Sequence, residues 1–102
     1  MLIGKVIGSV VSTRKDDRLV GHKLLIVRPL VPGGDDVLEV VSGRCLVSVD
    51  LVGAGKGETV LMVSGSTARA AASVDSESPP IDACIVGIVD SVEVEGREVH
   101  YA

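Results

Sequence analysis

The sequence predicts a mainly β protein that folds as a small barrel with one short α-helix between its late strands. Twenty of its 102 residues are valine, a β-branched residue that favours strands. Glycine and proline divide the chain into short apolar segments, as turns between strands do. Only one segment has a helical composition, which is too little helix for the crossovers of a parallel α/β sheet. A small closed or nearly closed barrel fits these observations best.

Turns separate the strands that we expect in the first part of the chain. These strands are Leu2–Val11, His22–Val31, Val37–Val41, Cys45–Leu51 and Glu58–Val63. The first contains Gly4 and Gly8, and glycines inside a strand mark a bulge or a close approach of two backbones. Such features are expected in a small barrel, whose strands curve sharply.

The remaining elements follow without a linker long enough to separate domains. Ser66–Ala72 contains four alanines and has Ser66 as a possible N-cap, so it predicts a short helix. Ala83–Val94 returns to a strand pattern, and Gly96 can turn the chain into Glu98–Tyr101. We therefore expect one domain over residues 1–102, with residues 95–102 as a C-terminal tail or extra strand. Five strands with a helix between late strands are the outline of an OB-like barrel.

Charge and hydropathy exclude several classes of protein. The net charge of −4 argues against nucleic-acid binding, which usually requires a basic patch. Tyr101 is the one aromatic residue, so no platform for stacking bases is expected. The longest uncharged stretch, Thr59–Ala68, is much shorter than the roughly 20 residues of a membrane-spanning helix. Lys5 interrupts the N-terminal apolar run, unlike a secretory signal, so we expect a cytoplasmic protein. Its mean hydropathy of +0.45 favours burial of apolar surface between subunits.

The glycine-rich loop formed by Gly53, Ala54, Gly55, Lys56 and Gly57 resembles a phosphate-binding loop but departs from both common motifs. A P-loop requires glycine where Asp50 stands and Ser or Thr where Gly57 stands. The dinucleotide motif requires glycine where Glu58 stands. Both motifs also lead into a helix, whereas this loop leads into an expected strand. We therefore expect no nucleotide or other cofactor.

Residues that could support catalysis or bind a metal are scattered. The candidates for metal binding are His22, Cys45, Cys84 and His100, and they lack ligand spacing. Asp50 and Asp90 each lie in an apolar run and could act as an acid–base pair. We favour the alternative that each carboxylate caps a turn or meets an arginine such as Arg69 across an interface. No catalytic residue or metal site is therefore expected, and the protein is not expected to be an enzyme.

Several blocks of the sequence resemble the EutN/CcmL family of bacterial microcompartment vertex proteins. They occur in the family's order and span roughly Met1 to Val94. The blocks are Leu2–Val11, Lys23–Val27, Val49–Glu58, Gly65–Arg69, Pro80–Ala83 and Ile85–Asp90. The resemblance implies an OB-like barrel that assembles into homopentamers. Such pentamers cap the vertices of an icosahedral shell that is otherwise tiled by hexameric shell proteins.

If the function is assembly, the residues of interest lie at subunit contacts and around the five-fold axis. Because its glycines permit close packing, the loop from Gly53 to Gly57 is our candidate for the pore rim. Asp50, Arg69 and Asp90 are candidates for the subunit interface, and Lys15 is a candidate for a loop that faces hexamers. The alternative function is an OB-like binding module for single-stranded nucleic acid or a small anion.

Overall fold

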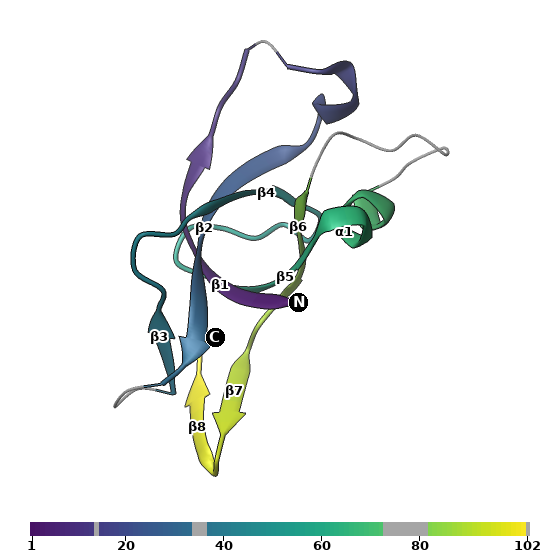
Figure 1. The fold of residues 1–102 in the computed structure, drawn as a ribbon. Helices are drawn as coiled ribbons and strands as arrows, with labels where there is room; N and C mark the ends of the chain where they lie inside the picture. Colours follow the sequence, from purple (N-terminus) through teal and green to yellow (C-terminus); the bar gives the residue numbers. More distant parts are fainter. Residues whose placement is uncertain (14, 34–36, 73–81, 102) are drawn as a thin grey trace.

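The computed structural model describes residues 1–13, 15–33, 37–72 and 82–101, with only the backbone at positions 66, 69 and 72. Eight strands, one α-helix and one 3-10 turn make up this part of the chain (Figure 1). The strands are β1 (Leu2–Val10), β2 (Lys23–Pro32), β3 (Leu38–Val40), β4 (Leu46–Asp50), β5 (Thr59–Ser64), β6 (Ala83–Ile88), β7 (Ser91–Val94) and β8 (Arg97–His100). The helices are α1 (Gly65–Ala72) and the 3-10 turn η1 (Asp17–Leu19).

Five of the strands close into a barrel. They follow the order β1-β5-β6-β4-β2, and β2 pairs again with β1 to complete the ring. All of these pairings are antiparallel except that of β4 with β6, which is parallel. The short strand β3 extends the sheet beside the end of β2. The prediction of a mainly β barrel with a short helix between late strands is confirmed.

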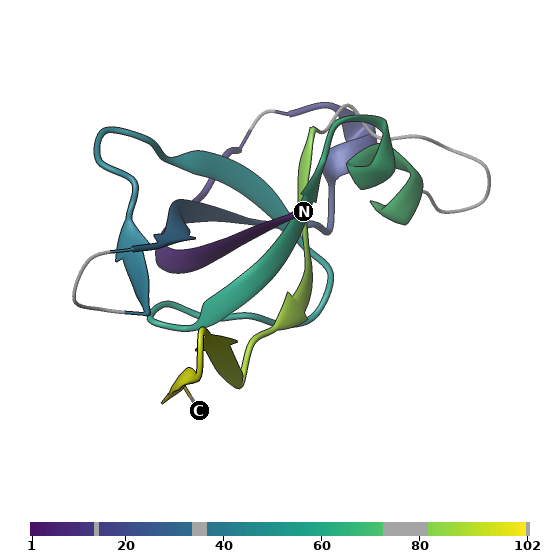
Figure 2. The ribbon, with the colours of Figure 1, turned by 60° about the horizontal axis from the view of Figure 1, so that its bottom comes forward.

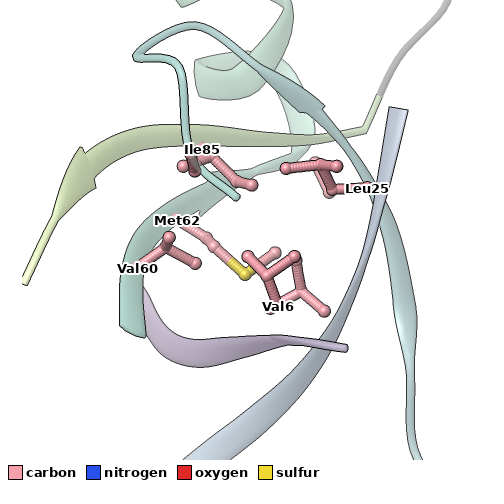
Figure 3. Packing of buried hydrophobic residues seen from close by; sticks show 8 residues of the cluster. Val6, Leu25, Val60, Met62 and Ile85 are labelled. Carbon is pink, nitrogen blue, oxygen red and sulfur yellow. The ribbon is translucent and has the colours of Figure 1, made fainter. Parts of the chain in front are cut away.

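The barrel interior is filled by small and medium apolar side chains. Val6 enters from β1, Leu25 from β2, Val60 and Met62 from β5 and Ile85 from β6, and all five are almost completely buried (Figure 3). Alternation along each strand places these residues inside and their sequence neighbours outside. The interior is thus packed without any large aromatic residue, as the composition requires.

At Gly4, the packing of β1 against β2 leaves no room for a side chain. A β-carbon placed on Gly4 would collide with Cγ1 of Val27 and would lie 3.3 Å from Sδ of Met62. The pairing register of β1 and β2 then shifts between Val6 and Gly8, which indicates a bulge. Both features expected from glycines inside the first strand, a close approach and a bulge, are therefore present.

A second apolar cluster lies between the outer wall of the barrel and α1. Val49, Val63 and Cys84 point outward from β4, β5 and β6 and pack with Ala68 of the helix. Leu19 of η1 and two strand residues cover the edge of this cluster. Burial raises the pKa of the Cys84 thiol, and the negative charge of Asp50 acts in the same direction.

The end of the chain differs from the expected single strand over Ala83–Val94. The strand ends at Ile88, and the chain leaves the barrel before β7 begins. Val89 N donates a 2.8 Å hydrogen bond to Thr59 O, while Tyr101 N donates a 2.7 Å bond to Asp90 O. These bonds fix the exit point. Beyond it, β7 and β8 form a separate hairpin that projects from the barrel (Figures 1 and 2).

Candidate functional site

The loop from Gly53 to Gly57 joins β4 to β5 and is held against β1. Gly57 N donates a 2.8 Å hydrogen bond to Val6 O, and Val6 N donates a 3.0 Å bond to Glu58 O. Within the loop, Gly55 N donates to Oε1 of Glu58 at 2.7 Å. Gly53 and Gly57 have φ angles of +79° and +91°, a region that favours glycine. The loop therefore has one well-defined backbone path.

Within this loop, Ala54 and Lys56 face opposite environments. Ala54 is only 1% exposed and packs in the barrel core, so its side chain anchors the loop. Its main-chain oxygen accepts a 2.9 Å hydrogen bond from Nζ of Lys23. Lys56 is exposed. The loop therefore offers backbone and the Lys56 side chain to its surroundings, and it runs into strand β5 as the sequence predicts.

Asp50 lies at the end of β4, whereas Asp90 lies beyond the end of β6. Asp50 ends β4, and its Oδ1 accepts a 3.1 Å hydrogen bond from Val52 N, so its carboxylate caps the turn that follows. Ile85 is the residue of β6 that pairs with Asp50, whereas Asp90 follows five residues later, beyond the end of β6 at Ile88. The structure does not bring the two carboxylates together as an acid–base pair.

The other two candidate residues lie elsewhere. Arg69 is in α1, and its side chain lies outside what the structure describes. Lys15 is exposed in the long connection between β1 and β2. In that connection, Nε of Arg18 lies 2.9 Å from Oδ1 of Asp16. The hydrogen bonds from Arg18 lower the pKa of Asp16 to about 2.

The described residues form few of the features that bind metals or small ligands. Within ranges 1–13, 15–33, 37–72 and 82–101, no three His, Cys, Asp or Glu side chains are close enough to hold a metal ion. Tyr101 lies beside Lys5 and Leu30 in a shallow hollow and is the one aromatic residue of the chain. No helix in the described part is both long and apolar enough to cross a membrane.

The hydropathy of the sequence predicts surplus apolar surface but does not indicate where on the fold it lies. Several large apolar side chains are exposed on the single chain, and Val47 on the outer face of β4 is 52% exposed. The others on the strands and in the loop after β4 include Val31, Val40, Leu51, Val52 and Ile88. Outward positions can be found only once the strand register is known, because a one-residue slip exchanges the two faces.

Comparisons with known proteins agree with this architecture. A family model described as "Ethanolamine utilisation protein EutN/carboxysome" matches residues 1–90. The chain is 41% identical to the bacterial microcompartment shell vertex protein EutN of Escherichia coli K12, over 99% of each chain. It is 42% identical to the carboxysome shell vertex protein CcmL of Synechococcus elongatus, over 98% of this chain and 94% of that one.

A solved structure of a pentameric relative also resembles this fold. The pentameric microcompartment shell protein GrpN of Rhodospirillum rubrum superposes with a TM-score of 0.75 at 46% identity. The alignment covers 92% of this chain and 98% of GrpN. From the family match over residues 1–90 and the similarity along nearly its whole length, this chain belongs to the EutN/CcmL family.

Proposed function

We propose that this chain is a shell vertex subunit of a bacterial microcompartment, that it forms a closed homopentamer, and that the pentamer contacts hexameric shell proteins. The observation that carries the proposal is similarity over nearly the full length to proteins named as shell vertex proteins. The closely similar fold of GrpN, a pentameric shell protein, supports the five-fold ring. The protein's role is then structural.

The symmetry of a shell explains why such a subunit is needed. Hexamers tile a flat layer, and a closed icosahedral shell needs five-fold units at its corners. A ring of identical subunits uses one heterologous contact, in which two different surfaces of the chain meet, repeated until the ring closes. The apolar side chains exposed on the single chain, such as Val47 and Val52, are surface that this kind of contact can cover.

Within the ring, the loop from Gly53 to Gly57 forms the rim of a central pore. Two left-handed glycines and hydrogen bonds to β1 support this assignment, because they fix the backbone where subunits must pack closely. Ala54 anchors the loop in its own barrel, and exposed Lys56 supplies a charge at the rim.

The remaining sequence candidates belong to the same proposal. Asp50 and Asp90 belong to the contact between subunits, where Arg69 of a neighbour pairs with one of them. The Asp50 carboxylate uses Oδ1 for the turn at Val52, which leaves Oδ2 for an arginine. Lys15, exposed in the β1–β2 connection, faces the hexamers.

The variant Gly55→Val tests the pore loop. A β-carbon at this position would have Oε1 of Glu58 at 3.5 Å as its nearest neighbour, which is an ordinary contact. The single subunit should therefore fold, and any loss of the ring would arise from packing between subunits. We expect an unchanged circular dichroism spectrum with fewer pentamers by native mass spectrometry, and a smaller effect for Gly55→Ala. Normal pentamers and closed shells from Gly55→Val would remove the loop from the pore.

A further inference from the structure

The hairpin formed by β7 and β8 lies outside the barrel sheet and pairs only with itself. Figures 1 and 2 show it projecting away from the barrel wall. A lone two-stranded hairpin is marginally stable in water unless something packs against it. Its residues also lie beyond the stretch 1–90 that matches the family model. The hairpin therefore offers a surface that is not paired with the barrel sheet of its own chain.

One face of this hairpin is acidic. Glu93 on β7 stands directly opposite Glu98 on β8, and both are exposed. We call these two residues the acidic pair. Like charges directly opposite each other destabilise a strand pair. Oε1 of Glu98 lies 3.1 Å from Nε2 of the exposed His100, and Oε1 of Glu93 accepts a 2.6 Å hydrogen bond from Gly96 N.

The outer wall of the barrel carries two positive charges that stand opposite each other on neighbouring strands. Lys5 on β1 stands directly opposite Arg28 on β2, and we call these two residues the basic pair. Gly4 and Val6 on β1, and the neighbours of Arg28 on β2, point inward, so both cations point outward. Arg44 lines the same surface hollow as Arg28. Across the described ranges, no carboxylate lies within ion-pair distance of any of these three cations.

The acidic pair and the basic pair have the same spacing and opposite charge. Each consists of two like charges on neighbouring antiparallel strands, with β-carbons about 5 Å apart. Each is unfavourable in the isolated chain and would become favourable beside the other. They do not meet within the chain: the ion pairs of the described residues join other partners. Two complementary surfaces that form no ion pair with each other in one chain suit a heterologous ring contact, in which different surfaces of neighbouring copies meet.

We propose that the β7–β8 hairpin of one subunit docks on the outer barrel wall of its neighbour in the ring, with the acidic pair against the basic pair. This inference rests on the proposed homopentamer. It names the contact that aligns each subunit with its neighbour in the ring. Complementary charges across an interface fix its register and disfavour wrong partners. The partner of the hairpin is thus a second copy of this chain.

Neutralising the acidic pair is the first test. The double variant Glu93→Gln/Glu98→Gln keeps the shape of both side chains, and the amide oxygen introduced at position 93 can still accept the bond from Gly96 N. We expect the protein concentration at which half the chains are pentameric to rise by about tenfold. The matched control is Asp17→Asn/Asp82→Asn, which removes the same charge at exposed positions outside the hairpin and should leave assembly unchanged.

Charge exchange is the second test. Glu93→Lys/Glu98→Lys and Lys5→Glu/Arg28→Glu should each abolish pentamers, because like charges then face each other. The chain that carries all four changes should recover them. A mixture of the two double variants should recover pentamers poorly, since a ring with an odd number of members cannot alternate two kinds of subunit without one repulsive contact.

These results separate the two proposals. If the unmodified protein is pentameric and both double charge reversals assemble as it does, the docking contact is overturned while the proposed function stands. Loss of hexamer binding with unchanged pentamers would also overturn it, because the hairpin would then serve another partner. If the unmodified protein forms no pentamer at all, the proposed function itself fails.

Discussion

The side-chain nitrogen of Lys23 donates a 2.9 Å hydrogen bond to the main-chain oxygen of Ala54. This bond ties the start of β2 to the loop between β4 and β5, and the Ala54 methyl group on the same residue is buried in the barrel. Two distant segments are thus held together at the base of the proposed pore rim. The variant Lys23→Met removes the donor while keeping most of the aliphatic chain.

We expect Lys23→Met to lower the free energy of unfolding by about 1 kcal/mol, because the carbonyl of Ala54 loses a partly buried partner. Urea denaturation followed by circular dichroism measures the change. Lys56→Met in the same loop is the control, since this lysine is exposed and should change stability little. Equal effects of the two variants would show that the bond to Ala54 contributes nothing.

Replacing Gly4 with alanine should destabilise the fold, because even a methyl group does not fit there. In Gly4→Ala the new methyl group would collide with the Val27 side chain between two fixed strands. We expect a loss of about 1–3 kcal/mol in unfolding free energy. Gly8→Ala is the control in the same strand, because its β-carbon would lie 3.7 Å from Cδ1 of Ile26, an ordinary contact. Equal melting temperatures for the two variants would contradict the close approach.

Replacing Ser48 with alanine should stabilise the protein. Its hydroxyl oxygen is buried and, among the described residues, is the one buried side-chain oxygen or nitrogen without a hydrogen-bond partner. Its register partner on β2 is Leu25, a core residue. Ser48→Ala should raise the unfolding free energy by about 1 kcal/mol, because it removes an unsatisfied polar group. Ser9→Ala, at an exposed position, is the control, and a loss of stability in Ser48→Ala would indicate an undetected partner.

The carboxyl group of Asp16 should titrate at an unusually low pH. Its folded-state pKa of about 2 lies below the ordinary value of 3.8, because Arg18 donates hydrogen bonds to the ionised carboxylate. The stabilising contribution of this group is therefore fully present above the ordinary value and is lost as the pH falls through about 2. Carboxyl carbon chemical shifts measure the midpoint. Arg18→Gln should return it toward the ordinary value, whereas an unchanged midpoint would exclude the Arg18 side chain as a cause.

The barrel was largely predictable because its strands are rich in valine and its turns contain glycine or proline. The end of the chain was harder to predict. Ala83–Val94 contains strand-forming residues throughout, and nothing local marks Ile88 as the end of a strand. The break depends on hydrogen bonds from Val89 to Thr59 and from Tyr101 to Asp90, which join residues far apart in sequence.

The candidate site was predictable only at the level of segments. The glycine-rich loop joins β4 to β5 as expected, and its place at the pore rim stays a prediction. Ala54 turns inward, which depends on the three-dimensional path of the loop. The basic pair could not be found from sequence, because the partner of Lys5 depends on the register of β1 and β2. That register includes a bulge next to Val6, and one residue of slip would have placed a different side chain opposite Lys5.

The native mass of the protein decides whether this chain closes into a five-membered ring. Native mass spectrometry at micromolar concentration should show five chains of 10.5 kDa each, a particle of about 52 kDa. A single species of one chain across the same concentrations would exclude the five-membered ring, and so would a stable ring with another number of subunits.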